Sequence, residues 1–119
     1  MTASLYERLG GTDGITQIAG DVVDNHLANT RISTRFADSD IAGIKNAAAT
    51  FFITGTGGPE VYTGKDMVAA HAGMNIDAEE FMAVLDDSLK AMAKNNIGQR
   101  EQEEVLYVLY SMRTDIMHV

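Results

Sequence analysis

The chain has 119 residues, the length of one domain, and its content of 45% hydrophobic and 22% charged residues is typical of a folded globular protein. Its 17 acidic against 9 basic residues give a net charge of −8, which argues against binding to a nucleic-acid backbone. The absence of cysteine excludes disulfides, thiolate zinc sites, iron–sulfur clusters and cysteine nucleophiles.

The first residues show neither the basic region nor the apolar stretch of a signal peptide. No run of residues approaches the roughly 20 apolar positions that a membrane span requires. We therefore expect a soluble cytoplasmic protein with no membrane segment, folded as a single domain over residues 1–119 and monomeric by default.

Apolar residues recur at helical spacing in almost every segment. The first helix is expected to begin with Thr12 or Asp13 as its cap. Its inward face would consist of Ile15, Ile18, Ala19, Val22, His26 and Leu27. A second helix is expected after Asp40 and would end at the glycine-rich stretch 55–58 and Pro59. Its inward face would consist of Ile41, Ile44, Ala48, Phe51 and Phe52.

Three more helical segments follow. A short one carries Met67, Ala70, His71 and Met74, and a longer one begins after Asp77, a good N-cap. The last is expected over residues 99–117 as one helix. Alternation of apolar and polar residues never holds over four positions, so strands are not expected. The sequence predicts an all-α protein of five or six helices without an internal repeat.

Few residues are candidates for chemistry. The segment from Gly58 to Lys65 fails as a phosphate loop, because its glycines are one residue too far apart and Asp66 follows the lysine. The three histidines lie in different predicted helices, without the spacing of a zinc site. His71 continues an apolar stripe among small alanines, so it suits either one axial side of a haem iron or an ordinary helical core.

Several short blocks resemble a known family, the group I truncated haemoglobins, which are small two-over-two globins. The blocks follow the family's order and spacing and cover most of the chain. They are Leu5-Tyr6-Glu7-Arg8-Leu9-Gly10-Gly11, Arg35-Phe36-Ala37-Asp38, Phe51-Phe52, Gly57-Gly58-Pro59-Glu60 with Tyr62-Thr63-Gly64, and Met67-Val68-Ala69-Ala70-His71-Ala72-Gly73-Met74.

The resemblance implies an abbreviated globin fold, a two-over-two helical sandwich around haem b. It makes His71 the proximal ligand of the iron and Phe36 the phenylalanine that stacks on the haem edge. The residues expected on the distal side are Ile44, Ala48, Phe51 and Phe52. Those expected on the proximal side and rim are Met67, Ala70, Ile76, Phe81 and Val84.

The chain departs from the family where relatives hold oxygen with a tyrosine and a glutamine. The tyrosine position falls on Val23, and the two distal positions of the next helix fall on Ile44 and Ala48. A hydrogen bond to the partly negative oxygen is worth roughly 1.5–3 kcal/mol, so we expect weak oxygen retention and less effect on carbon monoxide or nitric oxide. His26 is a candidate distal donor; the alternative is a histidine that faces Asp24 or solvent.

The leading hypothesis is a protein that binds oxygen, carbon monoxide or nitric oxide at a haem iron, for oxygen binding or transport or for gas-related redox chemistry. The alternative is a haem-free, globin-shaped interaction domain. Nitric oxide dioxygenase activity, with an unidentified reductase, is disfavoured by the missing tyrosine and glutamine. Peroxidase-like activity has no distal acid–base group other than His26.

Overall fold

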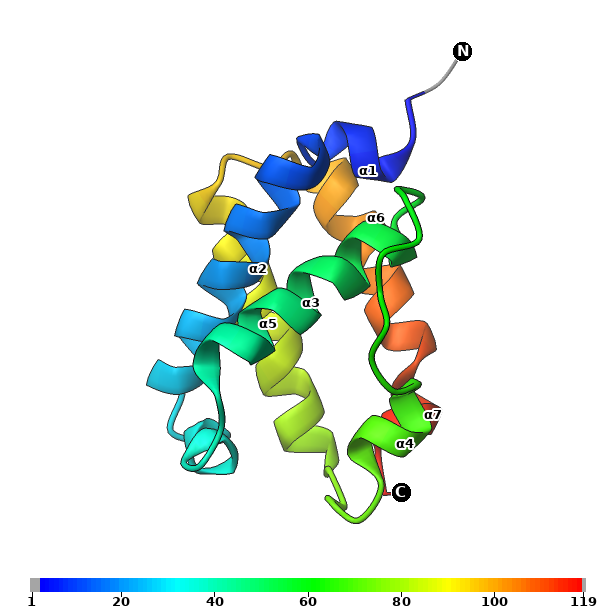
Figure 1. Ribbon diagram of the computed structural model, residues 1–119. Coiled ribbons are helices and arrows are strands. Elements are labelled where there is room, and N and C mark those ends of the chain that lie inside the picture. The colour runs from blue at the N-terminus through cyan, green and yellow to red at the C-terminus, as the bar shows by residue number, and fades with distance from the viewer. Residues whose placement is uncertain (1–2, 119) are drawn as a thin grey trace.

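A computed structural model describes residues 3–118, and all regular elements of this range are helices (Figure 1). One isolated bridge pairs Ile76 with Met117. The elements in chain order are α1 (Leu5–Arg8), α2 (Gly11–Ala28), the 3-10 helix η1 (Ser33–Phe36), α3 (Ile41–Gly55), α4 (Met67–His71), α5 (Ala78–Lys94), α6 (Gln99–Ser111) and α7 (Arg113–Ile116). The all-α prediction is confirmed, and the four-residue helices α1 and α7 bring the number of α-helices in this range above the expected six.

The start of α2 differs from the prediction. Its N-cap is Gly10, in a left-handed conformation with φ of 100° that favours glycine, so the expected cap at Thr12 or Asp13 is wrong. The hydroxyl of Thr12 is instead 2.6 Å from the hydroxyl of Tyr6, which also accepts a hydrogen bond from the Thr12 backbone N–H. The side chain that was expected to cap α2 therefore ties its first turn to α1.

The predicted start of α5 is confirmed, and the predicted length of the last helix is wrong. Asp77 caps α5, because its carboxylate accepts the backbone N–H of Glu80 and the Glu80 side chain accepts that of Asp77. The expected single helix over residues 99–117 instead breaks at Met112, where α6 ends and α7 begins. The chain then turns to pair with the segment before α5, since the His118 backbone N–H donates to the Ile76 carbonyl.

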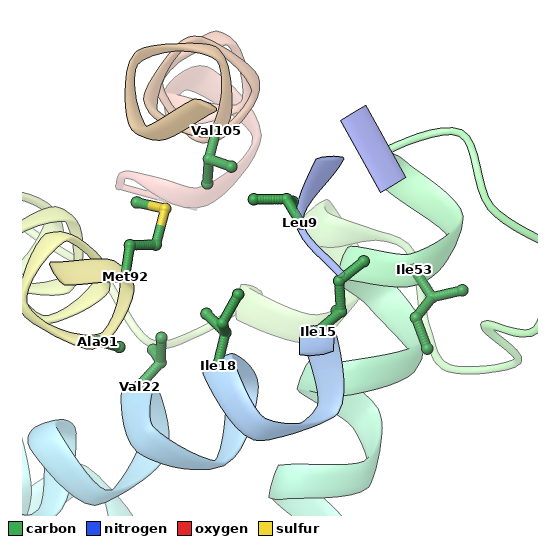
Figure 2. Packing of buried hydrophobic residues seen from close by; sticks show 8 residues of the cluster. All are labelled: Leu9, Ile15, Ile18, Val22, Ile53, Ala91, Met92 and Val105. Carbon is green, nitrogen blue, oxygen red and sulfur yellow. The ribbon is translucent and has the colours of Figure 1, made fainter. Parts of the chain in front are cut away.

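Two pairs of helices form the sandwich: α2 packs against α3 and also against α5, which packs in turn against α6 (Figure 1). The larger hydrophobic core lies among these helices and α1. Its buried members, shown in Figure 2, are Leu9, Ile15, Ile18, Val22, Ile53, Ala91, Met92 and Val105. A smaller core of Ile76, Phe81 and Leu85 lies near the other end of α5, where α4 and α7 lie side by side. No helix within residues 3–118 is long and apolar enough to cross a membrane.

A buried carboxylate, Asp21, connects α2 to the end of α5. Asn95 Nδ2 donates to it at 2.9 Å, and Gln17 Nε2 and Lys94 Nζ donate at 3.2 Å each. The hydrogen bond from Asn95 is the largest cause of a lowered pKa for Asp21, and the bonds from Gln17 and Lys94 add to it while burial opposes it. The carboxylate therefore stabilises the folded state as long as it stays ionised.

We expect Asp21→Asn to lower the free energy of unfolding near neutral pH by about 1–3 kcal/mol. Because folding lowers the pKa of Asp21, its contribution is present above the ordinary aspartate value of about 4 and is lost as pH falls through the folded value. Urea unfolding at a series of acidic pH values should show a shallower loss of stability in this variant than in the wild type. The exposed Asp38→Asn is the control, and equal slopes for the wild type and Asp21→Asn would contradict the prediction.

Candidate functional site

An apolar cavity of about 450 Å³ lies beside the smaller core. Each helix from α2 to α7, including η1, contributes at least one residue to its wall. Its lining residues are His26, Ile32, Arg35, Phe36, Ser39, Ile44, Ala70, His71, Met74, Ile76, Glu80, Phe81, Val84, Leu85, Leu109 and Ile116. A larger groove of about 650 Å³, between the end of α2 and α5, is open and is lined mostly by charged and amide side chains. Burial of an apolar cofactor therefore favours the smaller cavity.

The cavity brings together seven of the residues expected at the site. These are Phe36, Ile44, Ala70, His71, Ile76, Phe81 and Val84. The other four, Ala48, Phe51, Phe52 and Met67, are not among its lining residues. Phe52 packs against the larger core, and Phe51 meets the rings of Phe52 and Tyr62 edge-on at 5.9 Å and 5.5 Å between centroids. Phe52 and Phe51 thus connect α3 to the larger core and to Tyr62, and not to the cavity.

His71 stands at the end of the short helix α4. The helix is capped by Asp66, whose carboxylate accepts the backbone N–H of Ala69 at 2.8 Å. His71 Nδ1 lies 2.8 Å from the carbonyl oxygen of Met67, which can only accept a hydrogen bond, so Nδ1 carries the proton. In the neutral ring this leaves the lone pair on Nε2, which is the form that binds a metal. Met67 therefore acts through its backbone, as the residue that orients the imidazole.

His26 also lines the cavity, and it does not face Asp24 or solvent. Its ring is buried and stacked on Phe36, with 5.8 Å between centroids and 15° between planes. Its Nδ1 lies 2.7 Å from Oδ2 of Asp87, which is buried in α5. Asn29 Nδ2 donates to both oxygens of the same carboxylate at 3.2 Å. His26 in the cavity wall is thus held by Asp87, which does not line the cavity itself. Sequence reasoning did not find this pair, because Asp87 looks like an ordinary surface acid in the sequence.

A second polar pair, Arg35 with Glu80, joins η1 to α5 at the cavity wall. The guanidinium donates to both carboxylate oxygens, with Nη2 at 2.9 Å from Oε1. This hydrogen bonding is the largest cause of the lowered pKa of Glu80 and of the raised pKa of Arg35, and burial opposes both shifts. The two residues are 45 positions apart in the sequence, so no local pattern reveals the pair.

The side chains that line the cavity fit a metal bound within a cofactor that supplies most of the ligands itself. Within residues 3–118 no group of three or more histidine, aspartate or glutamate side chains is placed to hold an ion. A single imidazole with a free Nε2 beside an apolar cavity instead suits a flat macrocycle that supplies four ligands to its iron. The residues present therefore fit haem.

Comparison with known proteins shows similarity to globins. The family model for bacterial-like globins matches residues 4–118. The group 1 truncated haemoglobin GlbN of a Nostoc species is 25% identical over 116 residues, covering 98% of both chains. The corresponding protein of a Synechocystis species is 29% identical over 110 residues, covering 89% of both chains.

Solved structures of truncated haemoglobins superpose closely on this fold. The truncated haemoglobin of Tetrahymena pyriformis in its Fe(III) form has a TM-score of 0.95 at 25% identity, covering 98% of this chain and 100% of its own. The two-over-two haemoglobin of a Synechococcus species, solved with covalently attached haem, has a TM-score of 0.89 at 26% identity, covering 97% and 98%. The chain therefore belongs to the bacterial-like globin family, whose members bind gases at haem, and has the two-over-two fold of the truncated haemoglobins.

Proposed function

We propose that the 450 Å³ cavity holds haem b with His71 as the proximal ligand, and that the protein binds oxygen, carbon monoxide and nitric oxide on the opposite side. The observation that carries this proposal is the hydrogen bond of 2.8 Å between His71 Nδ1 and the Met67 carbonyl, since it leaves the Nε2 lone pair for a metal. When bound, haem would supply an iron that can take up a diatomic gas.

The chain's own side chains hold the macrocycle and keep water from it. Phe36, Ile76, Phe81 and Val84 supply apolar wall, and burial of such surface is worth roughly 25 cal/mol per Å². Arg35 and Ser39 are the cationic and hydroxyl donors of the wall that suit the carboxylates of haem. The wall is thus apolar along most of its area, with polar groups in a few places.

The gas side of the cavity carries an aliphatic side chain, Ile44, where relatives carry a hydrogen-bond donor. Ile44 lines the cavity, whereas Val23, the other such position, is buried in α2 and is not among the lining residues. Without a tyrosine or glutamine at these positions, oxygen is held weakly, and reactions that require a long-lived oxygen complex are slow. We therefore favour gas binding over nitric oxide dioxygenase turnover with a reductase.

Titration of the purified protein with haem tests the proposal. We expect saturation at about one haem per chain, a sharp Soret band, a five-coordinate ferrous spectrum and a shift of the band with carbon monoxide. The second candidate, a haem-free interaction domain, is suggested by the aliphatic distal positions and would take up no stoichiometric haem. That result would overturn the proposal.

A further inference from the structure

His71 is carried by a short helix that has little packing of its own. The residues of α4 are all at least partly exposed, and the helix lies between the irregular segments 56–66 and 72–77. An isolated helix shorter than about 12 residues is marginal in water, so α4 depends on its neighbours. Among the helices of residues 3–118, α7 is the one against which α4 packs most, and the two lie side by side in Figure 1. The support of His71 is therefore to be sought in the C-terminal segment, residues 113–118.

The C-terminal segment is joined to the irregular segment that follows α4. Met117 pairs with Ile76 in the isolated bridge, and the His118 backbone N–H donates to the Ile76 carbonyl at 3.0 Å. His118 Nδ1 lies 3.1 Å from the side-chain oxygen of Asn75. Asn75 and His118 have φ of 48° and 58°, left-handed conformations that residues other than glycine keep only where surrounding contacts impose them. The junction is therefore a specific one.

Packing and one backbone bond extend this junction to His71. Met74, Ile116 and Met117 pack against the smaller core, to which Ile76 belongs. The Met74 backbone N–H donates to the His71 carbonyl at 3.1 Å, so the turn after α4 begins at the histidine itself. The half-buried Met117 thus supports, through the smaller core, both the turn and the helix that precedes it.

We propose that the C-terminal segment positions His71 for the haem iron, with Met117 as the positioning residue. The inference rests on the proposed function, because it concerns the residue proposed to bind the iron. The Met67 carbonyl fixes the tautomer and rotation of the imidazole, whereas the C-terminal segment fixes the helix that carries it. A ligand on a loosely held element takes several positions, and its bond to the metal is then weaker and less uniform.

The first test is amide hydrogen exchange by NMR on the haem-free protein. In Met117→Ala, the amides of Ala70 and Met74, whose bonds close α4 and its following turn, should exchange about tenfold or more faster, because fewer contacts oppose local opening. The Ile44 amide at the start of α3 should exchange at the wild-type rate. Met82→Ala shortens an exposed methionine of α5 and should change none of the three amides.

Two results of this test would contradict the inference. Unchanged exchange at Ala70 and Met74 in Met117→Ala would show that the methionine does not support α4. Acceleration of the Ile44 amide by the same factor would show that Met117 only adds to the general stability of the fold. If Met117→Ala does not fold, Met117→Val allows the same comparison with a smaller loss of contact.

The second test is resonance Raman spectroscopy of the ferrous haem protein, whose iron–histidine stretching band reports the strength and uniformity of that bond. In Met117→Ala the band should broaden and move to lower frequency, and haem affinity should fall about 10–100-fold, as for other groups that orient a metal ligand. Met117→Leu keeps a side chain of similar volume and should restore both properties. His118→Asn keeps the backbone N–H and should match the wild type. A wild-type band in Met117→Ala would overturn the inference.

The outcomes separate this inference from the proposed function. A wild-type protein that takes up no haem would overturn the proposed function, and the role toward iron with it, whatever the exchange rates show. A wild-type protein that takes up haem and binds carbon monoxide, with exchange rates and an iron–histidine band that Met117→Ala leaves unchanged, would overturn the positioning role alone.

Discussion

Replacing His71 with alanine is expected to abolish stable haem binding. The substitution removes the imidazole whose Nδ1 is fixed by the Met67 carbonyl at 2.8 Å and whose Nε2 is left free. Loss of a partner that only orients a metal ligand typically costs about 10–100-fold in metal affinity, so loss of the ligand itself should cost more. Haem titration followed by the Soret band should show weak, broad binding in place of a sharp stoichiometric end point.

Three controls make this result specific to coordination. Addition of imidazole to His71→Gly should restore the five-coordinate spectrum, because the free base fills the space of the missing side chain. His118→Asn changes a histidine that is exposed at the end of the chain, and it should bind haem as the wild type does. Circular dichroism of the haem-free variants should remain helical. A His71→Ala protein with wild-type affinity and spectrum would show that another residue holds the iron.

The fold was largely predictable because the signals that set it are local. Asp77 and Glu80 lie three residues apart and form the expected capping box of α5. Predictions failed where a distant contact overrides local preference. Thr12 is bonded to Tyr6 instead of capping α2, and the pairing near Ile76 draws the chain away from the helix expected to run on past Met112.

The site was predictable only in part, for a similar reason. His71 stands out through its motif, and its role as the iron ligand stays a prediction that the haem titrations test. Phe52 sits on the same predicted stripe as Ile44, but it packs against the larger core while Ile44 lines the cavity. The pair of His26 and Asp87 joins two helices across 61 positions, and a single sequence holds no signal for it. Helical periodicity reports which face is buried and not which of two buried spaces a residue meets.

The cavity wall suggests a way to strengthen oxygen binding. Val23 is 2% exposed in the tightly packed part of α2, so a tyrosine there would overpack the core at a cost of about 1–3 kcal/mol. Ile44 is half-buried near the start of α3 and lines the cavity directly. A longer polar side chain at position 44 can therefore reach the space beside the gas without displacing the packed interior.

We expect Ile44→Gln to slow oxygen dissociation by about 10–100-fold, because its amide N–H donates a hydrogen bond worth roughly 1.5–3 kcal/mol to the partly negative oxygen. Stopped-flow measurement of oxygen release from the ferrous protein gives the rate. Ile44→Leu keeps the volume and adds no donor, so it should release oxygen at the wild-type rate. Carbon monoxide dissociation should change far less than oxygen dissociation in both variants. Equal oxygen release from Ile44→Gln and Ile44→Leu would show that α3 does not form the gas side of the cavity.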